Sequence, residues 1–122
     1  MKRLLLFLSL LGPTNVLIAD ELPVDMLNFS KLHLYDSLRN SVESDEMYRI
    51  IDLNVSGSCQ NKSIECSAEG QIQFVSTLCN TERSIFSQFH YNVLSDGTTV
   101  GLIITFFEQC NGEFVRRSEA IK

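Results

Sequence analysis

Cysteine, histidine and carboxylate side chains are the groups of this 122-residue chain that could carry out chemistry. His33 and His90 lie in no recognisable catalytic or metal-binding motif, and we expect His90, between two aromatic residues, to be a structural histidine. The 15 Asp and Glu residues offer pairs of acids by chance, so glycoside hydrolysis stays an alternative with no motif behind it. We therefore predict that the chain is not an enzyme and needs no metal or other cofactor.

The cysteines Cys59, Cys66, Cys79 and Cys110 contain no C-x2-C pair, which disfavours a structural zinc site. An even number of cysteines in a small exported chain is instead typical of disulfides.

The first residues have the layout of a signal peptide. Lys2 and Arg3 precede an apolar run that Gly12-Pro13 interrupts, and the small residue Ala19 precedes two acids. The run is shorter than the roughly 20 apolar residues of a membrane-spanning helix. We predict a signal peptide over residues 1–19 and a single domain over 20–122. The domain is expected in the bacterial periplasm, or outside the cell if the source is eukaryotic.

The charge of the chain argues against nucleic acid as a partner. The formal net charge is -5, and removal of Lys2 and Arg3 with the signal peptide would make it -7. Proteins that hold phosphate backbones need the opposite sign.

One amphipathic helix is predicted from about Asp25 to Val42, because apolar residues recur there at helical spacing. The stripe expected to face the core consists of Leu27, Leu34, Tyr35, Leu38 and Val42. The residues expected to face solvent are Ser30, His33, Asp36, Ser37, Arg39 and Asn40.

Beyond Glu46 the hydrophobic period changes to two, which is typical of strands. The dipeptides Asp96-Gly97 and Asn111-Gly112 favour two-residue type I′ turns and predict an antiparallel meander. We predict an α+β fold, with one N-terminal amphipathic helix on an antiparallel, meander-like sheet of about five strands; curling toward a β-sandwich is the alternative. The strands are expected at roughly 47–56, 69–78, 84–95, 98–109 and 113–120.

This topology predicts the disulfide pairing. In a meander, the end of the first long strand and the start of the next share one rim of the sheet, while the ends of the second and fourth share the other. The pairs Cys59–Cys66 and Cys79–Cys110 follow, each contributing about 2–4 kcal/mol to stability.

The two-residue turns also predict which strand residues share a face. Ile85, Phe89, Tyr91 and Val93 are expected to lie beside Val100, Leu102, Ile104 and Phe106 in one core face. The opposite face would then carry Phe86, Leu94, Ile103 and Phe107. Because one helix cannot cover both faces, we expect this second apolar face to be buried by the chain's own N-terminal segment, by curling of the sheet, or by another subunit or partner.

Acidic residues gather at the predicted rim that holds Cys79 and Cys110. Three of them follow the helix C-terminus, where the helix dipole disfavours carboxylates, so we expect them to have another use, such as contact with a basic cleft. The acidic rim consists of Glu43, Asp45, Glu46, Glu82, Glu108 and Glu113.

The layout of signal peptide, acidic domain, single helix, antiparallel strands and four cysteines resembles the periplasmic immunity proteins of type VI secretion systems. Within them it is most similar to those that neutralise the lysozyme-like, peptidoglycan-hydrolysing C-terminal domain of a VgrG spike effector. The resemblance implies a periplasmic homodimer that inhibits a muramidase-like toxin by occluding its glycan cleft, as in a toxin-antitoxin pair.

Two other binding functions stay open. A helix followed by antiparallel strands and two disulfides also resembles the cystatins, but Gln71-Ile72-Gln73-Phe74-Val75 lacks the glycine of their Q-x-V-x-G motif. A secreted ligand-binding or adhesive domain is the other alternative.

Overall fold

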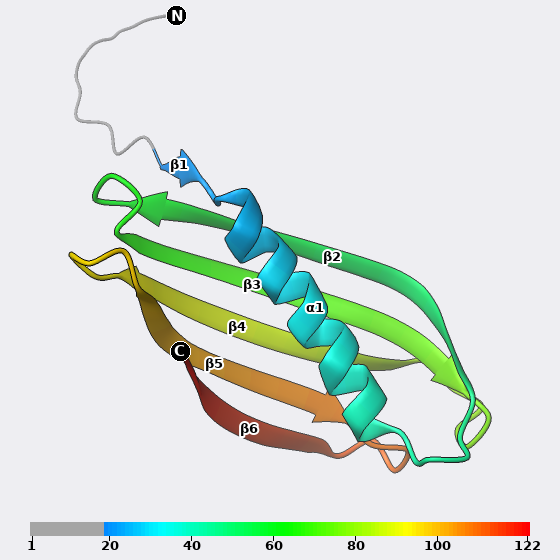
Figure 1. Ribbon diagram of the computed structural model, residues 1–122. Coiled ribbons are helices and arrows are strands. Elements are labelled where there is room, and N and C mark those ends of the chain that lie inside the picture. The colour runs from blue at the N-terminus through cyan, green and yellow to red at the C-terminus, as the bar shows by residue number, and fades with distance from the viewer. Residues whose placement is uncertain (1–18) are drawn as a thin grey trace, which may run out of the picture.

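The computed structural model describes residues 19–122, so the predicted signal peptide lies outside the described residues except for Ala19. Six strands form one antiparallel sheet in sequence order, and a single helix crosses one face of it diagonally (Figure 1). The elements are β1 (Asp20–Glu21), α1 (Val24–Ser41), β2 (Tyr48–Gln60), β3 (Glu65–Ser76), β4 (Arg83–Val93), β5 (Thr99–Glu108) and β6 (Phe114–Ile121).

The α+β meander with one helix and two disulfides is confirmed, with two corrections. A short strand, β1, precedes the helix and pairs with the end of β2, so the helix is not the first element and the sheet has six strands instead of about five. The sheet stays open: α1 covers one face, and the sheet does not curl into a sandwich (Figure 1).

The turns that join the last three strands differ from the prediction by one residue. Gly97 has a φ of 86°, and its N–H donates to the Leu94 carbonyl while the Leu94 N–H donates to Thr98. This is a three-residue loop with glycine in the left-handed position, one of the common hairpin geometries. Gly112 (φ 83°) makes the equivalent loop between β5 and β6.

The buried stripe of α1 also differs from the predicted one. Met26, Leu34 and Leu38 are buried as a hydrophobic stripe should be, but Ser30 and Ser37, which were expected to face solvent, are buried with them. Tyr35, expected in the core, is 38% exposed. The Ser30 hydroxyl can leave water because it bonds to the Met26 carbonyl and the Tyr91 hydroxyl, and small serines let the helix approach the sheet closely.

Two hydrophobic clusters between α1 and the sheet form the core. One surrounds the N-terminal half of the helix and includes the Cys59–Cys66 disulfide, Phe89 and Ile103. The other joins Leu34 and Leu38 to the sheet residues Ile72, Phe74 and Ile85. Gly70 allows this contact, because a Cβ at that position would lie 2.6 Å from a methyl carbon of Leu34.

Both predicted disulfides are present, and they staple opposite ends of the sheet. Cys59 and Cys66 are direct cross-strand partners with Cα atoms 4.0 Å apart. Cys79 and Cys110, with Cα atoms 5.6 Å apart, join the β3–β4 loop to the β5–β6 turn. Such bonds are typical of an oxidising extracellular or periplasmic compartment. Within residues 19–122, no helix has the length and hydropathy to span a membrane.

Candidate functional site

The sheet face opposite α1 carries an apolar patch formed mainly by β5. Even-numbered residues of β5 point away from the helix, since their neighbours Ile103 and Thr105 are buried beneath it. Leu102 is 42% exposed, and Phe86 of β4 lies across from Phe106 with ring centroids 6.4 Å apart. We define the apolar patch as Phe86, Val100, Leu102, Ile104 and Phe106.

The prediction of the second apolar face was therefore wrong for three of its four residues. Of its four residues, only Phe86 lies on the face opposite the helix. Ile103 is 1% exposed beneath α1, Phe107 packs against the core, and Leu94 lies in the β4–β5 turn. The three-residue turn causes this difference, because it shifts the register of β4 and β5 by one residue from the predicted one. A shift of one residue moves every side chain of a strand to the other face. The face without a helix does carry exposed apolar side chains, and what covers them stays a prediction.

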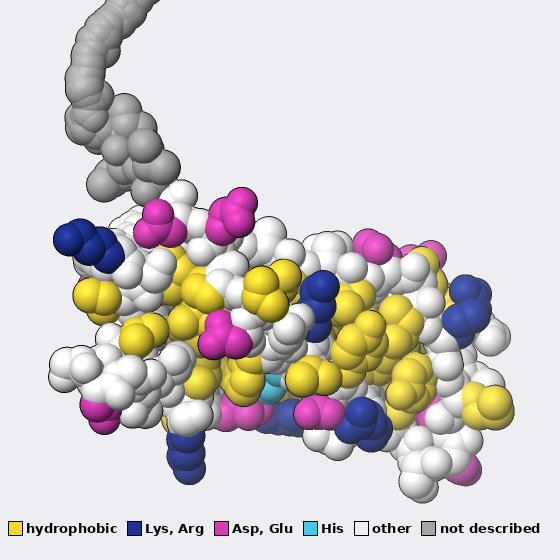
Figure 2. Space-filling model, turned by 45° about the horizontal axis from the view of Figure 1, so that its top comes forward, with side chains coloured by type: hydrophobic (Ala, Val, Ile, Leu, Met, Phe, Trp, Pro, Cys, Tyr) yellow, Lys and Arg dark blue, Asp and Glu magenta, His cyan; other side chains and the backbone are white. Residues whose placement is uncertain are grey.

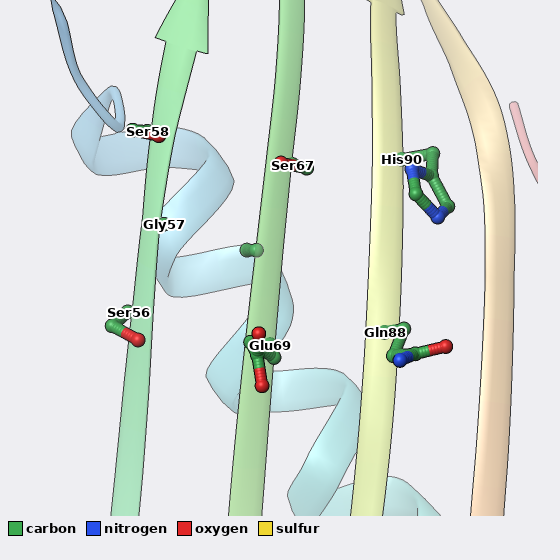
Figure 3. Close-up of a pocket in the computed structure, with 8 residues that line it drawn as sticks. Ser56, Gly57, Ser58, Ser67, Glu69, Gln88 and His90 are labelled. Atoms are coloured by element: carbon green, nitrogen blue, oxygen red, sulfur yellow. The ribbon is translucent and has the colours of Figure 1, made fainter. Parts of the chain in front are cut away.

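A polar trough lies beside the apolar patch, on β2, β3 and β4 of the same face. It forms two adjoining hollows of about 280 Å³ each, which share Ser58, Ser67 and His90. Figure 3 shows Glu69, Gln88 and His90 on the side of the strands away from the helix. Among the hydrogen bonds of residues 19–122, none joins His90 to Ser67 or Glu69.

The other histidine, His33, belongs to the packing between helix and sheet. Its Nε2 lies 3.2 Å from Thr105 Oγ1, and Thr105 in turn bonds to Ser87 at 2.8 Å. Burial lowers the pKa of His33, because the charged imidazolium is desolvated there, against the opposing effects of Glu119 and Asp36. In the part of the chain that the structure describes, no three His, Cys, Asp or Glu side chains gather closely enough to hold a metal ion.

The six residues of the acidic rim all lie at the end of the sheet that carries the Cys79–Cys110 disulfide. Glu43 and Asp45 line a small hollow there with Thr77 and Leu78. Glu82 is exposed in the β3–β4 loop, and Glu108 and Glu113 flank the β5–β6 turn. The meander therefore brings these acids to one end, as the topology predicts.

Glu46 is the exception among them, because it is used inside the protein. Its side chain is 3% exposed and accepts a hydrogen bond from Arg83 Nη2 at 2.8 Å. Burial alone would raise the pKa of Glu46, but hydrogen bonds from Ser76 and the Glu43 N–H, together with the Arg83 charge, hold it below its usual value. Arg83 also lies over the Phe74 ring, 4.7 Å from its centroid. We infer that Glu46 stabilises the fold and is not a contact residue.

The negative charge is not confined to the acidic rim. Acidic side chains spread from one end of the molecule to the other (Figure 2). The opposite end, where β2 turns into β3, carries a comparable set: Asp20, Glu21, Asp25, Glu65 and Asp96. The acidic rim is therefore no stronger a candidate for contact with a basic surface than this other end.

The turn between β2 and β3 has a backbone conformation that the sequence does not predict. Asn61, Lys62 and Ser63 have φ values of 53°, 57° and 69°, in the left-handed region where non-glycine residues are uncommon. The Cys59–Cys66 disulfide closes the base of the turn. The short spacing between these two cysteines is the signal that could have indicated a constrained tip, but no sequence rule predicts the left-handed backbone of Lys-Ser.

No protein family model, curated protein or solved structure matches this chain.

Proposed function

We propose that this chain is a periplasmic immunity protein, which binds a secreted peptidoglycan-degrading enzyme and occludes its active-site cleft. The partner proposed is the lysozyme-like C-terminal domain of a VgrG spike effector of a type VI secretion system. The proposal takes its partner class from the resemblance of the layout. Its physical support comes from the shape and rigidity of the chain.

The observation that carries the proposal is the uncovered face of the sheet. An apolar patch and a polar trough lie side by side there, a combination typical of protein interfaces with an apolar centre and a polar rim. The disulfides staple both ends of the sheet. A surface that is rigid before binding loses less conformational entropy in a complex, which favours inhibition by a preformed shape.

A second copy of the chain is the occupant we propose for the apolar patch. The patch is rich in aromatic and branched side chains, and a twofold axis near Leu102 and Ile104 would bury the same residues of both copies. The polar trough of the same face, and the end of the sheet beside it, would then stay free to face the toxin. Replacing Ile104 by Lys tests this, because the charge would have to be buried in the dimer; sedimentation should show monomers.

Protection of cells tests the function itself. Cells that express the lysozyme-like domain in the periplasm should lyse, and co-export of this chain should prevent lysis. Charge reversal at Glu43 and Asp45 tests the predicted role of the acidic rim. If the acidic rim contacts the toxin, this variant should protect cells less well and associate with the toxin more slowly. Full lysis with the wild-type chain present at high level in the periplasm would contradict the proposed function.

The polar trough favours one second candidate, a ligand-binding domain. Its serine hydroxyls, amide and imidazole could hydrogen bond to a polar ligand such as a glycan fragment. A thermal-shift screen with peptidoglycan fragments would detect this, and a Ser67→Ala variant should abolish any shift.

A further inference from the structure

The turn between β2 and β3 is held in an unfavourable backbone conformation. Three consecutive non-glycine residues, Asn61, Lys62 and Ser63, adopt positive φ values. For L-residues other than glycine and asparagine, this conformation costs roughly 1–2 kcal/mol each. Residues held in such regions persist only where surrounding structure imposes them, and they gather at functional sites. We call residues 60–65 the clamped tip.

The clamped tip is anchored on both sides. Cys59 and Cys66 form a disulfide directly beneath it, and both are almost completely buried. The Ile64 carbonyl accepts a hydrogen bond from Val93 at the end of β4 at 2.9 Å, and the Ile64 N–H donates to Asn61 at 3.2 Å. The turn is thus a fixed projection at the end of the sheet, beside β1 (Figure 1).

The clamped tip presents a cation. Lys62 is exposed, and neither of the two salt bridges formed within residues 19–122 involves it. Two acids lie at the base of the tip: Glu65 opens β3, and Asp20 of β1 pairs with Cys59. Ile64, 50% exposed, supplies apolar surface beside the ammonium group. A projecting lysine on a rigid turn can make a charge-assisted hydrogen bond to a recessed carboxylate on a partner.

We propose that the clamped tip is the element that enters the glycan cleft of the inhibited hydrolase, where the Lys62 ammonium pairs with a catalytic carboxylate. This inference rests on the proposed function and names the contact that performs it. Glycoside hydrolases of this kind depend on a carboxylic acid that protonates the leaving oxygen. An ammonium group in contact with that acid stabilises the ionised carboxylate, so the pairing removes the proton donor as well as blocking the cleft.

The test compares three variants of the full chain in inhibition of peptidoglycan clearing by the lysozyme-like domain. Lys62→Met keeps a long unbranched side chain at this left-handed backbone position but removes the charge. Lys62→Arg keeps the charge. Lys122→Met is the matched control, because it removes one positive charge at the same end of the sheet, beyond the last residue of β6. Melting temperature and non-reducing mass analysis establish that each variant is folded and oxidised.

Loss of one partner of a buried interfacial ion pair lowers affinity by on the order of a hundredfold. We expect that loss for Lys62→Met, a change of a few fold for Lys62→Arg and no change for Lys122→Met. If the catalytic Glu of the lysozyme-like domain is replaced by Gln, the wild-type chain and the Lys62→Met variant should bind that domain with nearly equal affinity.

Two results would overturn the inference while leaving the proposed function intact. The first is inhibition by Lys62→Met at wild-type strength. The second is loss of inhibition on charge reversal at Glu43 and Asp45 with the Lys62 variants unaffected, which would place the contact at the acidic rim. If the wild-type chain fails to inhibit at all, the proposed function itself is wrong, and the inference falls with it.

Discussion

The buried ion pair between Arg83 and Glu46 allows a quantitative test of how the acidic rim is built. Both side chains are almost completely buried, at 6% and 3% exposure, and their closest atoms are 2.8 Å apart. Removing one partner of a buried pair typically costs about 3–5 kcal/mol, because the other charge is left without compensation. We expect Arg83→Met to lower the free energy of unfolding by about 3 kcal/mol, the lower end of that range, since the Glu46 backbone belongs to a partly exposed loop.

The Glu46→Gln variant should cost as much or more, because the Arg83 charge then stays buried over the Phe74 ring without a counter-ion. The double variant should be less destabilised than the sum of the two single variants, since it leaves no unpaired charge. Urea unfolding followed by circular dichroism measures all four free energies. A cost below about 0.5 kcal/mol for Arg83→Met would show that the pair is solvated and that Glu46 is available to a partner after all.

The same pair predicts an acid-sensitive stability. The folded-state pKa of Glu46 lies below its ordinary value of 4.5, so its contribution is fully present above pH 4.5 and is lost as the pH falls through the lowered value. The wild-type chain should therefore lose more stability between neutral pH and pH 3 than Glu46→Gln does. Equal losses in the two proteins would contradict the assignment.

The remaining predictions concern the packing of the sheet. Gly101→Ala should destabilise the fold by about 1–3 kcal/mol or more, because the added Cβ would overlap the backbone carbonyl oxygen of His90. A melting temperature equal to that of the wild type would be inconsistent with this close approach. Because the pKa of His33 is lowered in the folded chain, the unfolded chain binds a proton more readily, and stability should fall as the pH drops through the ordinary pKa of 6.5. In the His33→Gln variant, the free energy of unfolding should change less between pH 7.5 and 5.5. An unchanged pH dependence in this variant would assign the titration to another group.

The sequence predicts the topology and the disulfides because these depend on element order. A meander brings Cys59 to Cys66 and Cys79 to Cys110 whichever exact register the strands adopt. The register itself depends on one residue in a turn. Asp-Gly fits a two-residue I′ turn and also a three-residue loop with glycine in the left-handed position, and the structure uses the second, with Gly97 at φ 86°.

Side-chain roles were harder to predict where a polar residue is satisfied inside the protein. Ser30 resembles a solvent-facing position until Tyr91, 61 residues later, supplies its hydrogen-bond partner. Glu46 resembles a surface acid until Arg83, 37 residues later, reaches it. Helical periodicity and local charge carry no information about such distant partners, which is why the predicted acidic rim lost one member.

Titration of peptidoglycan hydrolysis tests the central claim most directly. The purified, oxidised chain is added in steps to the lysozyme-like domain at a concentration well above the expected dissociation constant, and clearing of peptidoglycan is followed. We predict a linear fall to no activity at a fixed molar ratio, with the chain alone releasing no product. Undiminished hydrolysis at a tenfold excess of the chain, or cleavage of peptidoglycan by the chain itself, would contradict the account.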